Sequence, residues 1–177
     1  MKKMAICLIL FFAFQAVGQN TPKPTTLRGI LLEDLRTTHN VKDWFVPIDV
    51  AVEGLTAEQA SWKQGEGNHS VGQLAYHLWY WNRRSLEKME GKTQEKFSGN
   101  NDDTFSGFDP KKWDETVKNL DQVMSELEKF VETSDDATLQ KNASGIEHVA
   151  AHNAYHIGEM VVIRKLQGSW NPEKGVK

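Results

Sequence analysis

The chain has 177 residues, of which 21 are lysine or arginine and 24 are aspartate or glutamate, so its formal net charge is −3. An acidic chain lacks the basic surface that phosphate backbones attract, and nucleic acid is therefore not expected as a partner. The length suits one domain with one core, since neither a Pro/Ser-rich linker nor an internal repeat divides the sequence.

Residues 1–18 have the pattern of a secretory signal peptide. Two lysines precede an apolar run at 6–14, and small residues follow at 16–18. This run is shorter than the about 20 apolar residues of a membrane helix. We therefore expect an exported protein, periplasmic or secreted, with no membrane attachment after cleavage. Its mature part, 19–177, would be a single domain without any cysteine, because Cys7 leaves with the signal.

Four segments of the mature chain show helical periodicity and none shows sustained period-two alternation, which predicts an all-α domain. The first segment spans roughly 26–55, and Pro47 should kink or interrupt it because proline lacks the backbone N–H. Between the second and third segments, 97–109 is rich in Gly, Asn and Asp and reads as a surface loop.

The other three segments carry helix start and stop signals. Ser70 is followed three residues later by a glutamine, a capping box, and the helix that it starts should end near Gly91. Asp109 precedes a proline at the first helical position of the third helix. The fourth helix is expected to begin at a second capping box, Ser144 to Glu147, and to end at Gly168.

Histidines recur every four residues on the last segment, at positions 148, 152 and 156. This spacing keeps them on one helix face, where neutral imidazoles can share a metal ion. A further histidine, His77, lies in the apolar stripe of the second helix between Leu74 and Trp81, where burial would leave it in need of a partner. His77 with two histidines of the last helix would make a three-ligand site that is open to water or substrate. The alternative is that these histidines are structural.

Glu159 follows His156 by three residues and returns to about 20° from His152 around the helix. A carboxylate there can hydrogen-bond a ligating histidine, accept a proton as a catalytic base, or coordinate the metal directly. An ordinary salt bridge to Arg84 or Arg164 is an equal alternative.

Ser70 before the second helix, His77 within it, and His152-x-x-x-His156-x-Gly158-Glu159 on the last one together resemble the DinB/YfiT-like family. The similarity extends to the phrases AYHLWYWNRRSLEKMEG and HNAYHIGEMVVIRKLQGSW and spans most of the mature chain.

This resemblance implies a four-helix bundle of up-down-down-up topology that holds one divalent metal ion, zinc or nickel, through His77, His152 and His156. His148 is outside that triad, and we expect it to be an outer-shell or pocket-rim residue, with His39 and His69 at the surface or at helix ends. Relatives are often dimers, so a homodimer is one expectation.

Characterised members of the family include transferases that use low-molecular-weight thiols. Those thiols are cytosolic, and an exported member is expected to use metal-bound water instead. The sequence thus favours a metal-dependent hydrolase or transferase that acts on a small molecule, with Glu159 as the catalytic residue. The alternative is a non-catalytic metal-binding or small-ligand-binding protein of the cell envelope.

Overall fold

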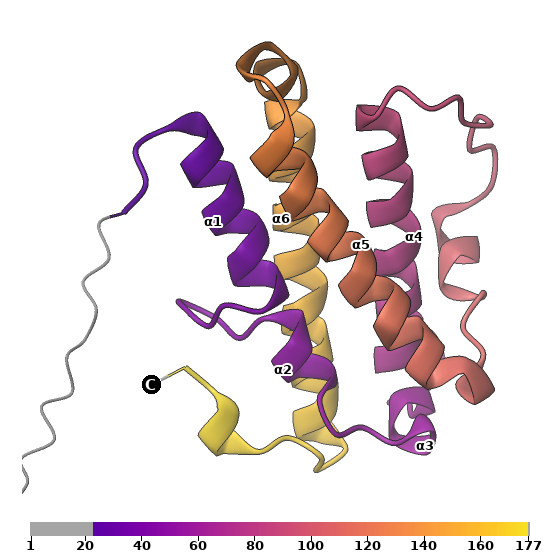
Figure 1. Cartoon of the computed structure of the whole chain (residues 1–177). Coiled ribbons are helices and arrows are strands. Elements are labelled where there is room, and N and C mark those ends of the chain that lie inside the picture. The colour runs from indigo at the N-terminus through magenta and orange to yellow at the C-terminus, as the bar shows by residue number, and fades with distance from the viewer. Residues whose placement is uncertain (1–22, 177) are drawn as a thin grey trace, which may run out of the picture.

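The computed structural model describes residues 23–176, and the predicted signal peptide lies outside this range. The described chain is all-α and contains no strand, so the predicted fold class with about four main helices is confirmed (Figure 1). The four long helices are α1 (Leu27–His39), α4 (Val71–Met89), α5 (Trp113–Thr133) and α6 (Asp136–Leu166). The short elements are α2 (Ile48–Val52), α3 (Ala57–Ser61) and the 3-10 helices η1 (Asn101–Phe105), η2 (Pro110–Lys112) and η3 (Pro172–Lys174).

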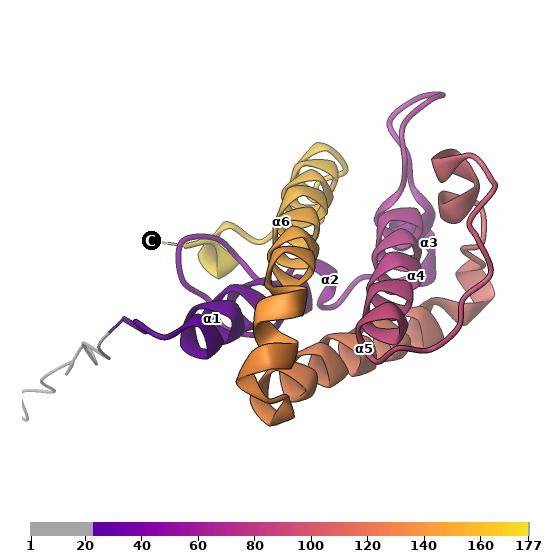
Figure 2. The same cartoon turned by 90° about the horizontal axis from the view of Figure 1, so that it is seen from above.

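The long helices surround one core. Helix α1 packs against α5 and α6, and α4 packs against the same two helices. Seen from above, α6 stands between α1 and α4 (Figure 2). Helices α1 and α6 run in one direction and α4 and α5 in the other (Figure 1). Because α4 and α5 are parallel, the connection between them, 90–112, must return along the bundle. Within the described chain, no helix is long and apolar enough to cross a membrane.

Helix α4 begins where the sequence predicts. The Ser70 hydroxyl accepts a hydrogen bond from the Gln73 backbone at 3.2 Å, and the Gln73 side chain accepts one from the Ser70 backbone at 3.0 Å. This reciprocal capping box satisfies two N–H groups that have no partner within the helix. It thus fixes the start of the helix that carries His77.

The first predicted segment is divided, as the proline suggested. Helix α1 ends at His39, and α2 starts directly after Pro47, which supplies its N-cap. A short helix, α3, follows with its own capping box between Thr56 and Gln59. Five residues are too few for periodicity to show a helix, and α3 was therefore not predicted.

The predicted start of the last helix is wrong. Helix α6 begins at Asp136, and the side chain of Asp135 caps it by accepting from the Thr138 backbone at 2.7 Å. The apparent capping box at 144–147 lies inside the helix. Leu139 is buried in the core, so the turn before this motif packs well enough to stay helical. The predicted end is correct, since Gly168 follows the helix with a φ of 77°.

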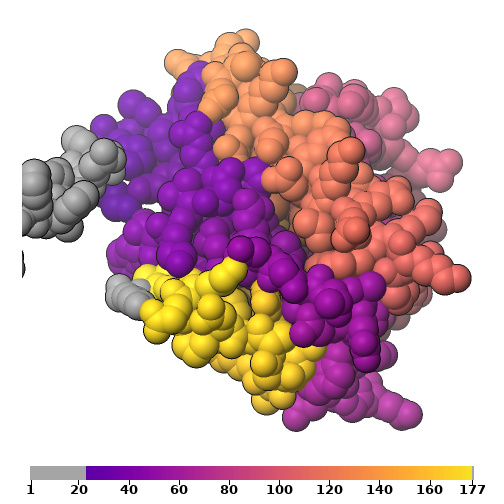
Figure 3. All heavy atoms as spheres, turned by 60° about the horizontal axis from the view of Figure 1, so that its bottom comes forward, coloured from indigo at the N-terminus to yellow at the C-terminus, as the bar shows by residue number. Residues whose placement is uncertain are grey.

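The C-terminal end of α6 is tied to α2. Arg164 is buried and donates to the backbone carbonyls of Val50 at 3.2 Å and Ala51 at 2.8 Å. A salt bridge between Lys174 and Glu53 joins the segment after α6 to the same region. Figure 3 shows these C-terminal residues against the segment around α2. The end of α6 is therefore held in place, which stabilises the helix that carries most of the candidate site.

His39 is at a helix end, as expected, but it is not at the surface. Its side chain is 2% exposed, with Nδ1 2.5 Å from Glu128 and Nε2 2.9 Å from Asp121, both on α5. Burial opposes the charged imidazole, yet the hydrogen bonds to Glu128 and Asp121 outweigh it and raise the pKa of His39. His39 is thus an ion-paired link between α1 and α5, and its two ring nitrogens are both engaged.

Candidate metal site

Three imidazoles meet in the core between α4 and α6. His77 comes from α4, and His152 and His156 come from successive turns of α6. The Nε2 atom of His152 lies 3.1 Å from Nε2 of His77 and 3.0 Å from Nε2 of His156. The three ring planes cross steeply, at 64°, 75° and 83°. The structure therefore brings together the three predicted ligands, all with the same ring nitrogen turned to a common centre.

The outer nitrogen of His77 is held by a threonine from the connection between α4 and α5, residues 90–112, which we call the crossover. Nδ1 of His77 lies 2.6 Å from the hydroxyl of Thr104, and this hydroxyl donates its hydrogen to the carbonyl of Asn101, also at 2.6 Å. Because the threonine hydrogen is used there, the hydroxyl can only accept from His77. The proton of His77 is thus on Nδ1, and its Nε2 presents a lone pair to the centre.

Glu159 does the same for His156. One carboxylate oxygen of Glu159 lies 2.5 Å from Nδ1 of His156, and no hydrogen bond joins Glu159 to Arg84 or Arg164 in the described chain. A carboxylate accepts the Nδ1 proton, so Nε2 of His156 also presents a lone pair to the centre. A carboxylate behind a ligating histidine is a common arrangement in metal sites, because it fixes the tautomer and the ring orientation.

The three Nε2 atoms at the centre have fewer protons than they need to hydrogen-bond to one another. Two of the three Nε2 atoms carry lone pairs, and only His152 has a proton to offer, which can satisfy one of them. A buried acceptor without a partner costs about 1–3 kcal/mol. A cation at the centre would receive all three lone pairs at once, so this donor set fits a metal ion.

The spacing of the nitrogens also fits. An ion with metal–nitrogen distances of about 2.05 Å would place the nitrogens about 3.3 Å apart in a tetrahedral site and about 2.9 Å apart on one face of an octahedral site. The observed separations, 3.0 and 3.1 Å, lie between these values. Imidazole ligands suit zinc, nickel, iron and copper alike.

Burial keeps the site neutral. Desolvation, followed by repulsion from the neighbouring rings, lowers the pKa of His77 to about 3. The same two causes lower the pKa of His152 to about 4. Desolvation also lowers the pKa of His156, although the hydrogen bond to Glu159 opposes the shift. All three rings are therefore uncharged at neutral pH, the form in which histidine binds metal.

A buried amide pair fixes α4 against α6 beside the histidines. Asn82 donates to the side-chain oxygen of Asn153 at 3.0 Å, and both residues are fully buried. The other two side-chain atoms, Asn82 Oδ1 and Asn153 Nδ2, have no hydrogen-bond partner in the described chain. Loss of the one bond would leave both amides wholly unsatisfied in the core, so this bond penalises any sliding of one helix along the other. Asn153 follows His152 directly, and the register of the two helices thus sets the distance between His77 and His152.

Part of the crossover covers the site, although the sequence predicted only a surface loop there. Phe105 of η1 is buried and stacks on His77 with ring centroids 3.9 Å apart, and His69 stacks on its other face at 3.7 Å. Phe108 anchors the segment after η1, since its ring occupies the place that a Cβ on Gly72 would need. The three phenylalanines of the loop, Phe97, Phe105 and Phe108, among glycines and polar residues were the available sign that it packs on the core.

His148 is exposed on the rim of a surface hollow of about 360 Å³. His152 also lines this hollow, whereas His77 and His156 are buried. His152 is therefore the one ring of the triad that this hollow reaches. His148 does not reach the three converging nitrogens, which agrees with its expected place outside the triad.

A second group of potential ligands is formed by His39 with Asp49 and Asp121. Both ring nitrogens of His39 are already bonded to carboxylates, which accounts for this group as an ion pair. The histidine triad is therefore the better candidate metal site in the described chain.

The chain is thus a helical bundle with a potential metal centre. Three histidines from two of its helices converge in the core. The model of the DinB superfamily matches residues 48–160, a range that contains the whole triad. The chain belongs to the DinB superfamily. Neither a curated protein nor a solved structure matched it in our comparisons.

Replacement of Thr104 by valine should weaken metal binding. The change keeps the shape of the side chain but removes the acceptor that holds the Nδ1 proton of His77, and loss of such an outer partner lowers metal affinity about 10- to 100-fold. Zinc affinity measured by competition with a chromophoric chelator checks this. The control is Thr133→Val, an exposed threonine at the end of α5 whose loss should leave affinity unchanged. Equal affinities for both variants would contradict the role of Thr104.

The metal-free protein should lose stability as the pH falls. The unfolded chain takes up a proton on His77 near pH 6.5, whereas the folded protein resists it until about pH 3. Between these values the unfolded state binds more protons, and at pH 5 the His77 contribution alone amounts to about 2 kcal/mol. Urea unfolding at pH 7 and pH 5 checks this, with His77→Phe expected to lose less stability over the same interval. The same loss in both proteins would refute the assignment.

Proposed function

We propose that this DinB-superfamily protein is a metal-dependent hydrolase or transferase that acts on a small molecule. The observation that carries the proposal is the proton-poor centre between Nε2 of His77, His152 and His156, where the outer partners of two rings direct lone pairs inward. These three histidines would hold one divalent ion, zinc or nickel. Three protein ligands leave a coordination position open, which is typical of catalytic rather than structural sites.

A divalent ion in this position would act as a Lewis acid that polarises a carbonyl or similar group of the substrate. The protein supplies the rest. Thr104 and Glu159 keep His77 and His156 in the tautomers that ligation requires, and Phe105 shields one face of His77 from water.

Glu159 has a second task in this proposal, as the catalytic residue. One of its oxygens binds His156, and its other oxygen has no hydrogen-bond partner among the described residues. The side chain is 42% exposed, and its second oxygen can accept a proton from an attacking group.

We also propose that the protein is exported to the periplasm or secreted, and that it works without nucleic acid or membrane, as a homodimer in line with the resemblance. The support for export is the pattern of residues 1–18. A non-catalytic metal-binding or ligand-binding protein of the cell envelope is the second candidate function, because the same triad would serve capture without turnover.

Metal content tests the site. Mature protein exposed to a mixture of divalent ions and then desalted should retain about one ion per chain, since three buried imidazoles bind more tightly than surface histidines. Mass-spectrometric metal analysis measures this. His77→Ala should abolish retention, while His148→Ala, an exposed histidine on the same helix as two of the ligands, should not change it. Equal losses from both would point to adventitious surface binding and overturn the proposal.

A substrate panel separates the enzyme from the binding protein. Esters, lactones, amides and thiol conjugates form the first panel, with the metal-loaded protein. If Glu159 accepts a proton in the reaction, Glu159→Gln should lower kcat about 10²- to 10⁴-fold at saturating metal. If it only orients His156, metal affinity should fall and kcat at saturating metal should stay the same. No turnover by the loaded protein on any member of the panel would favour the binding protein.

A further inference from the structure

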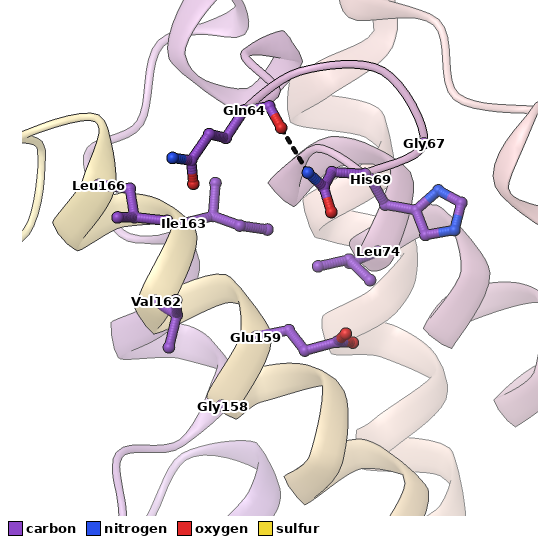
Figure 4. Close-up of a pocket in the computed structure, with 10 residues that line it drawn as sticks. Gln64, Gly67, His69, Leu74, Gly158, Glu159, Val162, Ile163 and Leu166 are labelled. Carbon is purple, nitrogen blue, oxygen red and sulfur yellow. Dashed lines mark hydrogen bonds between the residues drawn. The ribbon is translucent and has the colours of Figure 1, made fainter.

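A pocket of about 490 Å³ lies directly beside the triad, on the Glu159 side. It opens between the C-terminal part of α6 and the loop that leads into α4 (Figure 4). Its size falls within the range of about 300–1,000 Å³ that is usual for sites that bind small molecules. The backbone carbonyl of Gln64 accepts a hydrogen bond from the side chain of Asn68, which orders the loop above the pocket.

The wall of the pocket is apolar. Leu74 closes it on the α4 side, and Val162, Ile163 and Leu166 line it from α6. Val162 and Leu166 are each 53% exposed, so about half of each residue is open to solvent. A ligand would gain about 0.8 kcal/mol of binding free energy for each methylene group that it buries against this wall.

The pocket is lined by one acidic side chain, Glu159, and by no lysine or arginine of the described chain. Figure 4 shows Glu159 projecting from α6 toward the Leu74 side, while the ring of His69 points away from the apolar side chains. A carboxylate without a neighbouring cation repels anions and accepts hydrogen bonds from neutral donors.

Glu159 also connects the pocket with the triad. The carboxylate that borders the pocket is the one that binds Nδ1 of His156, and the opposite nitrogen of that ring faces the metal-binding centre. The pocket therefore ends one imidazole ring away from the centre. Gly158, in the preceding position, leaves the space open, because a Cβ added there would meet no atom within 4 Å.

We propose that this pocket binds an aliphatic part of an uncharged substrate, with a polar hydrogen-bond donor of that molecule at Glu159. As a statement about substrate class it rests on the proposed function, but the pocket itself does not depend on the metal. Anionic chains of the same length are rejected by the carboxylate.

Chain-length series of two simple probes test the proposal on the metal-free protein. The probes are linear primary amides from butanamide to octanamide and the carboxylates of matching length, titrated while backbone amide NMR shifts are recorded. Affinity for the amides should rise about fourfold for each added methylene, and the carboxylates should bind at least about tenfold more weakly. The shifts should concentrate at 64–74 and 158–166.

A substitution that fills the pocket provides a second test. Gly158→Leu places a side chain in the open space and favours the helix, so it should fold and lose most of the amide binding. Ala151→Leu introduces the same side chain at an exposed position of α6 and should bind like the wild type. Affinity without chain-length dependence, equal binding of the carboxylates, or unchanged binding by Gly158→Leu would each overturn the proposal.

The outcome is separable from that of the metal analysis. Amide binding in a protein that retains no metal would support the pocket and refute the proposed function. A protein that holds one ion and fails the amide series would keep its metal site and lose the proposed substrate class.

Discussion

The structure depends on burying three uncharged imidazoles whose lone pairs converge. Each buried nitrogen without a partner is costly, and a charged ring would be costlier still. The protein meets the first cost in part by giving His77 and His156 acceptors for their outer protons, and burial itself prevents the second by lowering the pKa values. The Nε2 lone pairs at the centre still lack partners, and a cation could accept all of them at once.

This constraint explains why the crossover matters. Parallel neighbours α4 and α5 cannot be joined by a short turn, so 90–112 has to run back along the bundle (Figure 1). The return path brings Thr104 and Phe105 onto His77. The buried Asn82–Asn153 pair then holds α4 and α6 in the register that makes the three rings meet. The helix topology, the crossover and the register of α4 and α6 thus together determine where the ring nitrogens of the three histidines lie.

Local signals in the sequence were reliable where the physics is local. The capping box at Ser70 and the helix end at Gly168 were both correct, because caps depend on residues within one turn. The box at Ser144 failed, since packing of Leu139 kept the preceding turns helical. His39 could not be placed in the interior from the sequence, because its partners Glu128 and Asp121 follow it in the chain by 89 and 82 residues.

The sequence by itself determined the all-α class, the shared helix face of His152 and His156, and the buried position of His77, because side-chain direction on a helix follows from spacing alone. Only the tertiary structure decided which partner each ring nitrogen has. It assigned Thr104 to His77, chose His156 rather than an arginine for Glu159, and opened a pocket beside them. These choices depend on hydrogen bonds and packing between segments far apart in the chain, and periodicity carries no information about such distances.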